Sequence, residues 1–127
     1  MTPLQDQFES LKREFPSATL QSLPSGAVVI AIPDFALPQG WSHPTTTVRF
    51  VAPVGYPFAK PDCFWTSPDL RLATGGVPQA ANHTTPIPEF NGLPLLWFSW
   101  HTGQWNANRD SFLTYAHVIE RRFKQLQ

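Results

Sequence analysis

The chain of 127 residues is poor in cysteine and in charged residues, and it has no long apolar run. Its only cysteine is Cys63, which excludes an intramolecular disulfide and a zinc site built from several cysteines. Nine Lys and Arg residues balance nine Asp and Glu residues, so a net charge of zero gives no electrostatic reason to bind nucleic acid.

Two further absences concern location. No apolar run approaches the roughly 18 residues that a membrane span needs, so we expect no membrane contact. The start Met-Thr-Pro-Leu-Gln-Asp lacks the basic and apolar regions of a signal peptide. With a single cysteine, these features predict a protein of the reducing cytoplasm.

Proline and aromatic residues are abundant instead. The chain has 14 Pro, 10 Phe and 5 Trp, and all the prolines fall between Pro3 and Pro94. Because 42% of the residues are hydrophobic, the chain is not a disordered proline-rich tail. Its length fits one domain, residues 1–127, with a substantial core.

Hydrophobic periodicity predicts a helix near each end of the chain. One stripe at helical spacing consists of Leu4, Phe8, Leu11 and Phe15, and the other of Phe112, Tyr115, Ala116, Ile119 and Phe123. We expect Thr2 to cap the first helix and Pro16 to end it. Asn108 or Asp110 is expected to cap the second helix.

Four strands are predicted between the helices, over residues 18–23, 27–32, 45–51 and 62–66. Pro33 and Asp34 are expected to end the second strand, and Thr46, Val48 and Phe50 to share one face of the third. Short connections favour an antiparallel meander, so the fold class is α+β with one sheet face covered by helices. Residues 67–104 are expected to form a long irregular loop, in which the apolar run 95–100 is buried or at an interface.

One motif stands between the third and fourth predicted strands. The segment Tyr56-Pro-Phe-Ala-Lys-Pro-Asp-Cys-Phe-Trp65 resembles the Tyr-Pro-Phe-x-x-Pro-x-x-x-Phe hallmark of ubiquitin-conjugating enzymes, which joins the same two strands in that fold. Trp105, just before the closing helix, is similar to the Trp of that family's Trp-Ser-Pro. The resemblance covers the chain from Leu4 to Phe123 and implies a UBC-like fold that lacks the family's last two helices.

This compact form is similar to bacterial members of the superfamily, found in operons that resemble ubiquitin-conjugation pathways. The resemblance therefore implies a ubiquitin-like protein and an activating-enzyme-like protein as partners. It also implies a role in a ubiquitin-like conjugation pathway, in antiviral defence.

The sequence departs from the family at the nucleophile. A conjugating enzyme carries ubiquitin as a thioester on a cysteine after the fourth strand, and this chain has no cysteine beyond Phe64 and no His-Pro-Asn. Cys63 falls within the fourth predicted strand, where we expect a small buried apolar residue.

Two functions stay open. In the first, Ser99 carries an acyl group as an oxyester, His101 serves as its base, and His83 approaches the same region. In the second, the chain is a catalytically inactive scaffold that binds the ubiquitin-like protein or its activating enzyme. A third and weaker alternative is an unrelated α+β enzyme that uses His83 or His101.

Aromatic residues are the candidates for binding. No Lys or Arg occurs from Leu72 to Asn108, so this region suits a neutral, apolar docking surface. The candidate binding residues are Trp97, Trp100, Trp105, Tyr56 and Phe58. Four scattered His residues and one Cys show no metal-ligand spacing, so we predict no metal and no cofactor.

Overall fold

The computed structural model describes residues 3–88, 90, 92–100 and 104–127. The elements in chain order are α1 (Pro3–Glu14), β1 (Thr19–Ser22), β2 (Val28–Ala36), β3 (Thr45–Ala52), β4 (Phe64–Thr66), β5 (Ala81–Asn82), β6 (Leu96–Phe98) and α2 (Phe112–Phe123). The strands form one antiparallel sheet in the order β1-β2-β3-β4-β6-β5. The α+β class is confirmed, and the sheet contains two more strands than the sequence predicts.

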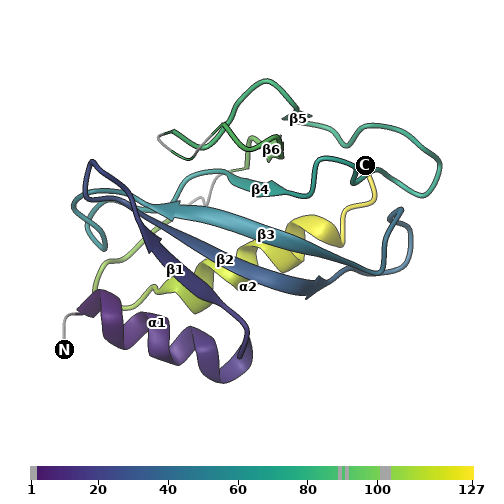
Figure 1. The fold of residues 1–127 in the computed structure, drawn as a ribbon. Helices are drawn as coiled ribbons and strands as arrows, with labels where there is room; N and C mark the ends of the chain where they lie inside the picture. The colour runs from purple at the N-terminus through teal and green to yellow at the C-terminus, as the bar shows by residue number, and fades with distance from the viewer. Residues whose placement is uncertain (1–2, 89, 91, 101–103) are drawn as a thin grey trace.

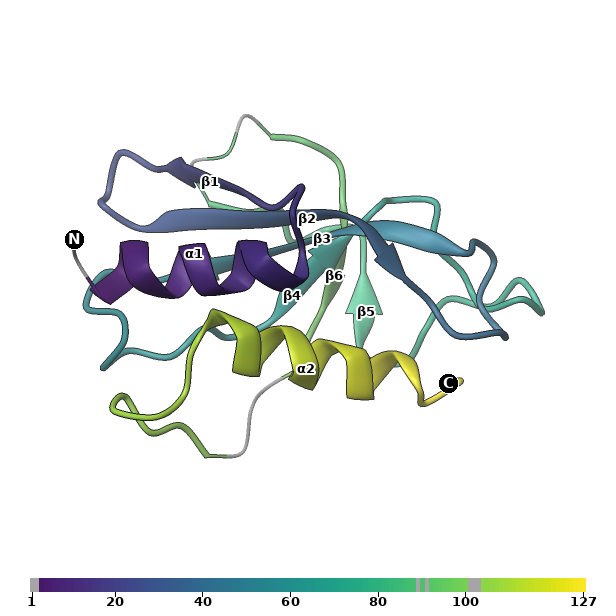
Figure 2. The ribbon, with the colours of Figure 1, turned by 90° about the horizontal axis from the view of Figure 1, so that it is seen from below.

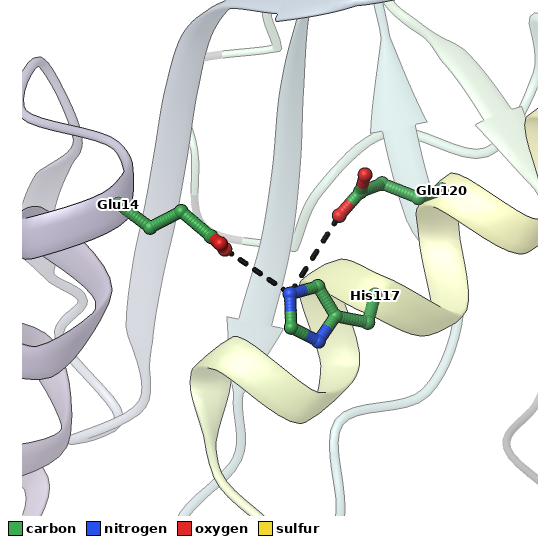
Figure 3. Close-up of side chains that lie close together, drawn as sticks. All are labelled: Glu14, His117 and Glu120. Carbon is green, nitrogen blue, oxygen red and sulfur yellow. Dashed lines mark hydrogen bonds and ion pairs between the residues drawn. The ribbon is translucent and has the colours of Figure 1, made fainter.

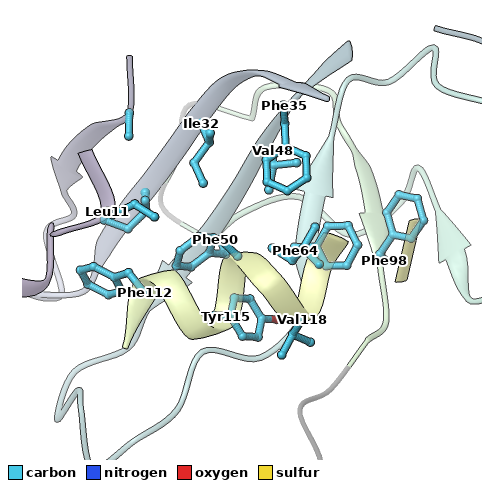
Figure 4. Packing of buried hydrophobic residues seen from close by; sticks show 14 of the residues in the cluster. Leu11, Ile32, Phe35, Val48, Phe50, Phe64, Phe98, Phe112, Tyr115 and Val118 are labelled. Atoms are coloured by element: carbon cyan, nitrogen blue, oxygen red, sulfur yellow. The ribbon is translucent and has the colours of Figure 1, made fainter. Parts of the chain in front are cut away.

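Both helices lie against the same face of the sheet (Figures 1 and 2). The larger core fills the space between them and the strands, where Leu11 of α1 and Phe112 of α2 are fully buried (Figure 4). Aromatic rings dominate this core: Phe50 of β3 meets Tyr115 of α2 edge-on, with ring centroids 5.0 Å apart. None of the helices in the described part of the chain is long and apolar enough to cross a membrane.

The closing helix α2 buries the face that its periodicity predicts, because all five apolar positions of the stripe lie in the core. The predicted cap is wrong. Ser111 caps the helix, accepting a hydrogen bond from the Thr114 N–H in a capping box. Asp110 is occupied elsewhere, since its carboxylate accepts the Asn106 N–H at 2.6 Å. The predicted cap of α1, Thr2, lies outside the described residues.

Strand β2 continues past the point where the sequence predicts its end. It runs through Pro33 and Asp34 to Ala36, and its register against β3 shifts between Ile32 and Phe35. Asp34 has a positive φ of 56°. Pro33 has no N–H to donate to the neighbouring strand, and a bulge at this point places it outside the paired positions. The proline therefore bends the strand without ending it. On β3, Thr46, Val48 and Phe50 are all buried on one face, as predicted.

The segment predicted as an irregular loop contains β5 and β6, and it also covers part of the outer sheet face. There a second, smaller core joins Trp65 of β4 to Ile87 and Leu95. The Trp65 indole N–H donates to the Thr85 carbonyl at 2.7 Å. The prediction that only one face is covered is therefore wrong, whereas the predicted burial within the run 95–100 is confirmed for Leu95, Leu96 and Phe98.

Candidate functional site

Residues 53–61, between β3 and β4, contain the Tyr-Pro-Phe-x-x-Pro part of the hallmark and are called here the hallmark turn. Both helices hold it in place. The Tyr56 ring stacks on Phe112 of α2 at 4.7 Å, and its hydroxyl donates to the Gln7 side chain of α1. The Trp105 indole N–H donates to the Pro57 carbonyl at 2.7 Å. Burial and the charge of Asp110 raise the pKa of Tyr56, so its hydroxyl stays protonated as a donor.

The tip of the hallmark turn points into solvent. The side chain of Phe58 is 84% exposed and that of Val54 is 63% exposed. Tyr56, by contrast, is half-buried, and both its ring and its hydroxyl are used in packing. Of the two predicted binding residues in this turn, Phe58 is therefore exposed to solvent, and Tyr56 anchors the turn to the two helices.

Next to the turn, Cys63 immediately precedes β4. Its φ is 68°, a left-handed conformation that is uncommon for residues other than glycine. Its N–H donates to the Trp100 carbonyl at 3.1 Å, and its carbonyl accepts the Tyr115 hydroxyl at 2.8 Å. Cys63 therefore lies outside the strand in which the sequence places it, and β4 starts at Phe64.

The Cys63 thiol is half-buried, not fully buried as the sequence predicts. Burial raises the pKa of Cys63, and the charge of Asp62 raises it further. Hydrogen bonds from the Trp100 backbone and the Trp97 side chain act in the opposite direction, and the net shift is upward. Because the thiolate is the nucleophilic form of cysteine, this site does not favour acyl transfer through Cys63.

Ser99 directly follows β6 at the same end of the sheet as Cys63, since Phe98 pairs with Phe64. The Ser99 N–H donates to the Ala80 carbonyl at 2.7 Å, and the residue is half-buried. Its predicted base, His101, lies outside the described residues.

His83 is placed away from Ser99. Ser99 lies beside Ala80, at the start of β5, because its N–H donates to the Ala80 carbonyl. Asn82, at the other end of β5, pairs with Trp97, and His83 follows Asn82, so His83 lies farther from Ser99 along the strand. The His83 ring is exposed, and its Nε2 lies 2.8 Å from the Pro68 carbonyl. The structure therefore does not bring together His83 and Ser99.

Among the predicted tryptophans, Trp97, Trp100 and Trp105 are all half-buried. Trp100 covers a buried cation, because the Arg122 guanidinium lies 5.3 Å from its ring centroid. Arg122 is 1% exposed and donates to the carbonyls of Gln79, Gln125 and Gln127. Burial lowers the pKa of Arg122. The sequence shows Arg122 only as a positive charge near a helix end, and nothing in its spacing signals this role.

Two hollows border the hallmark turn and the start of α2. The first, of about 200 Å³, is mainly apolar and is lined by Val51, Pro53, Lys60, Asp62, Trp65 and Pro88. The second, of about 600 Å³, is polar and is lined by Gln104, Trp105, Asn106, Arg109 and Asp110. Neither hollow is lined by Ser99 or Cys63, so neither provides a substrate cleft around a nucleophile.

The fold and the hallmark agree with the comparison to known families. The family model described as prokaryotic E2 family E matches residues 7–126, and the chain belongs to this family. It is a member that has no cysteine after β4, since Cys63 is the only cysteine. Membership suggests a role in a bacterial ubiquitin-like conjugation pathway. Comparison with curated proteins and with solved structures gives no match.

Proposed function

We propose that this protein acts in a bacterial ubiquitin-like conjugation pathway as a binding component that docks an activating-enzyme-like protein through the hallmark turn. The observation that supports this most is the 84% exposure of Phe58 on a turn fixed by Tyr56 and Trp105. An exposed aromatic side chain on an anchored turn buries a large apolar area on binding, and the turn's backbone then has little conformational entropy to lose, so it suits an interface.

The chemistry around Cys63 favours binding over thioester transfer. The pKa of Cys63 is raised, and the residue precedes β4 instead of following it. Trp97 in β6 packs against the smaller core, and Trp100 after β6 packs against the larger one. Both rings are half-buried, and we assign them to contact with the ubiquitin-like protein. The proposal takes residues 1–127 as one domain. The resemblance to operon-encoded bacterial proteins supports a cytoplasmic role in antiviral defence as part of it.

Replacing Phe58 tests the docking role. Because the side chain is mostly in solvent, Phe58→Ala should change the free energy of unfolding by no more than about 0.5 kcal/mol. It should weaken binding of the activating-enzyme-like protein from the same operon at least about tenfold, or roughly 1.4 kcal/mol. Isothermal titration calorimetry measures the affinity, and urea unfolding measures the stability.

Val77→Ala is the matched control, because Val77 is also an exposed apolar residue, 52% exposed, and lies between β4 and β5 outside the hallmark turn. Its affinity for the partner should equal that of the wild type. Unchanged binding by Phe58→Ala, or an equal loss in both variants, would contradict docking through this turn.

A second candidate function is the oxyester carrier, favoured by the position of Ser99, a half-buried hydroxyl residue directly after β6. In this reaction Ser99 Oγ attacks the activated C-terminal carbonyl carbon of the ubiquitin-like protein. The bond to the donor's leaving group breaks, an ester forms, and His101 takes the hydroxyl proton.

The carrier is tested by incubating the protein with its operon's activating enzyme, ATP and ubiquitin-like protein, followed by intact-mass measurement. A carrier gives an adduct that base cleaves and that is absent in Ser99→Ala but present in Ser17→Ala, a change at an exposed serine between α1 and β1. An adduct that survives Ser99→Ala would exclude this residue. Tight binding without any adduct would support the binding component alone.

A further inference from the structure

Three side chains with metal-binding groups meet between the two helices (Figure 3). His117 and Glu120 come from α2, and Glu14 is the last residue of α1. Their ligand atoms all lie within 4.8 Å of one another. The side chains are about half-exposed, between 45% and 51%, so an ion can reach them from solvent.

The distances between the ligand atoms suit a small divalent cation. His117 Nε2 lies 3.1 Å from Glu14 Oε2 and 3.8 Å from Glu120 Oε1. A tetrahedral zinc ion with bonds of about 2.0–2.1 Å needs its ligand atoms about 3.3 Å apart. The two distances from His117 Nε2 bracket that spacing, and the two carboxylates lie within 4.8 Å of one another.

The local structure also orients these ligands. Residues three apart on a helix lie on the same face, so α2 alone places His117 beside Glu120. The third ligand comes from a residue 103 positions away in the sequence, and the packing of α1 beside α2 fixes it. One imidazole and two carboxylates form a neutral complex with a divalent zinc ion and leave a fourth position for water.

From this geometry we infer that Glu14, His117 and Glu120 form a zinc-binding site that links the end of α1 to α2. The site is independent of the proposed docking function. Arg121 and Lys124 border the same surface hollow, and their positive charges lower the affinity of the site for a cation. We therefore expect a site that responds to added zinc and loses it readily to chelators.

The full chain is titrated with zinc chloride alone, by isothermal titration calorimetry and by thermal unfolding. We expect one zinc ion per chain and a rise of several degrees in the unfolding temperature, reversed by EDTA. Magnesium at the same concentration should have no such effect, because Mg²⁺ prefers a shell of oxygen ligands.

Three variants test the ligand set. His117→Gln should abolish the zinc response, and Glu14→Gln should weaken binding at least about tenfold. His43→Gln is the matched control, since His43 also has a carboxylate neighbour, Asp69 Oδ2 at 3.2 Å, and is not among these ligands.

Failure of the wild type to bind zinc would overturn the inference. An undiminished response in His117→Gln would overturn it as well. An unchanged affinity in Glu14→Gln would show that the ion does not join the two helices. Because calorimetry measures binding directly, the test does not depend on how stable each variant is.

Discussion

At the scale of single residues, Cys63 shows how backbone and side chain are used separately. Its backbone joins three elements, because its N–H donates to the carbonyl of Trp100 after β6 and its carbonyl accepts the hydroxyl of Tyr115 on α2. Its thiol is half-buried with a raised pKa. The backbone of this position therefore serves to begin β4 and to hold the strand ends.

The positive φ of Cys63 makes a test possible. Glycine avoids the strain that other residues carry in the left-handed region, which is roughly 1 kcal/mol. We expect Cys63→Gly to be more stable than Cys63→Ala by up to that amount, the reverse of the usual order in a strand or helix. Urea unfolding of both variants measures the difference. A more stable Ala variant would show that backbone strain at this residue is not significant.

At the scale of elements, the hallmark turn depends on contacts from both helices. Tyr56 reaches Gln7 of α1 and Phe112 of α2, and Trp105 bonds to the Pro57 carbonyl from the segment before α2. Within the turn itself, the N–H groups of Phe58 and Ala59 donate to the Gly55 carbonyl. These contacts anchor the backbone of the turn, while the Phe58 side chain stays exposed.

The hydrogen bond from the Trp105 indole to the Pro57 carbonyl is expected to control the position of the hallmark turn. Trp105→Phe keeps most of the ring but removes the hydrogen bond to Pro57, at a cost of about 1 kcal/mol in stability. Binding of the activating-enzyme-like protein should weaken too, because the turn that carries Phe58 loosens.

Trp41→Phe is the comparison, since it loses a similarly short indole bond, to the Phe123 carbonyl at 2.8 Å, outside the hallmark turn. It should lose similar stability but keep its affinity for the partner. Equal losses of affinity in the two variants would show that general destabilisation, and not the hallmark turn, explains the effect.

The elements also show which structures a sequence can predict. Local patterns were sufficient for the buried face of α2 and for the alternation of Thr46, Val48 and Phe50 on β3. They failed for β5 and β6, because β6 is short and its pairing with β4 joins segments about thirty residues apart. They also failed at Pro33, where a bulge lets β2 continue past a residue that usually ends a strand.

The candidate site was predictable only in part. The hallmark located the turn, since the motif itself contains Tyr56 and Phe58, but exposure of one and burial of the other depend on contacts with Gln7 and Phe112. The meeting of Glu14 with His117 could not be read from spacing at all, because 103 residues separate them.

At the scale of the whole molecule, different segments pack on the two faces of the sheet. Both helices pack on one face, and the segment that contains Ile87 and Leu95 packs on the other (Figure 1). With both faces partly covered, the exposed apolar side chains lie at turns and loops, and Phe58 is the most exposed large one among the described residues. The hallmark turn, with Phe58 and Val54, therefore carries the two most exposed large apolar side chains of the described residues, and this supports the proposed docking there. The net charge of zero gives electrostatic attraction only a small part in the proposed binding.

The most direct test is to map the interface on the intact protein. Backbone amide signals of the isotope-labelled chain are followed by NMR during titration with the unlabelled activating-enzyme-like protein. The largest changes should centre on the amides of Val54, Gly55 and Phe58, with little change at Gly75 and Val77. Changes centred on residues 75–77, or none at saturating partner concentration, would contradict docking through the hallmark turn.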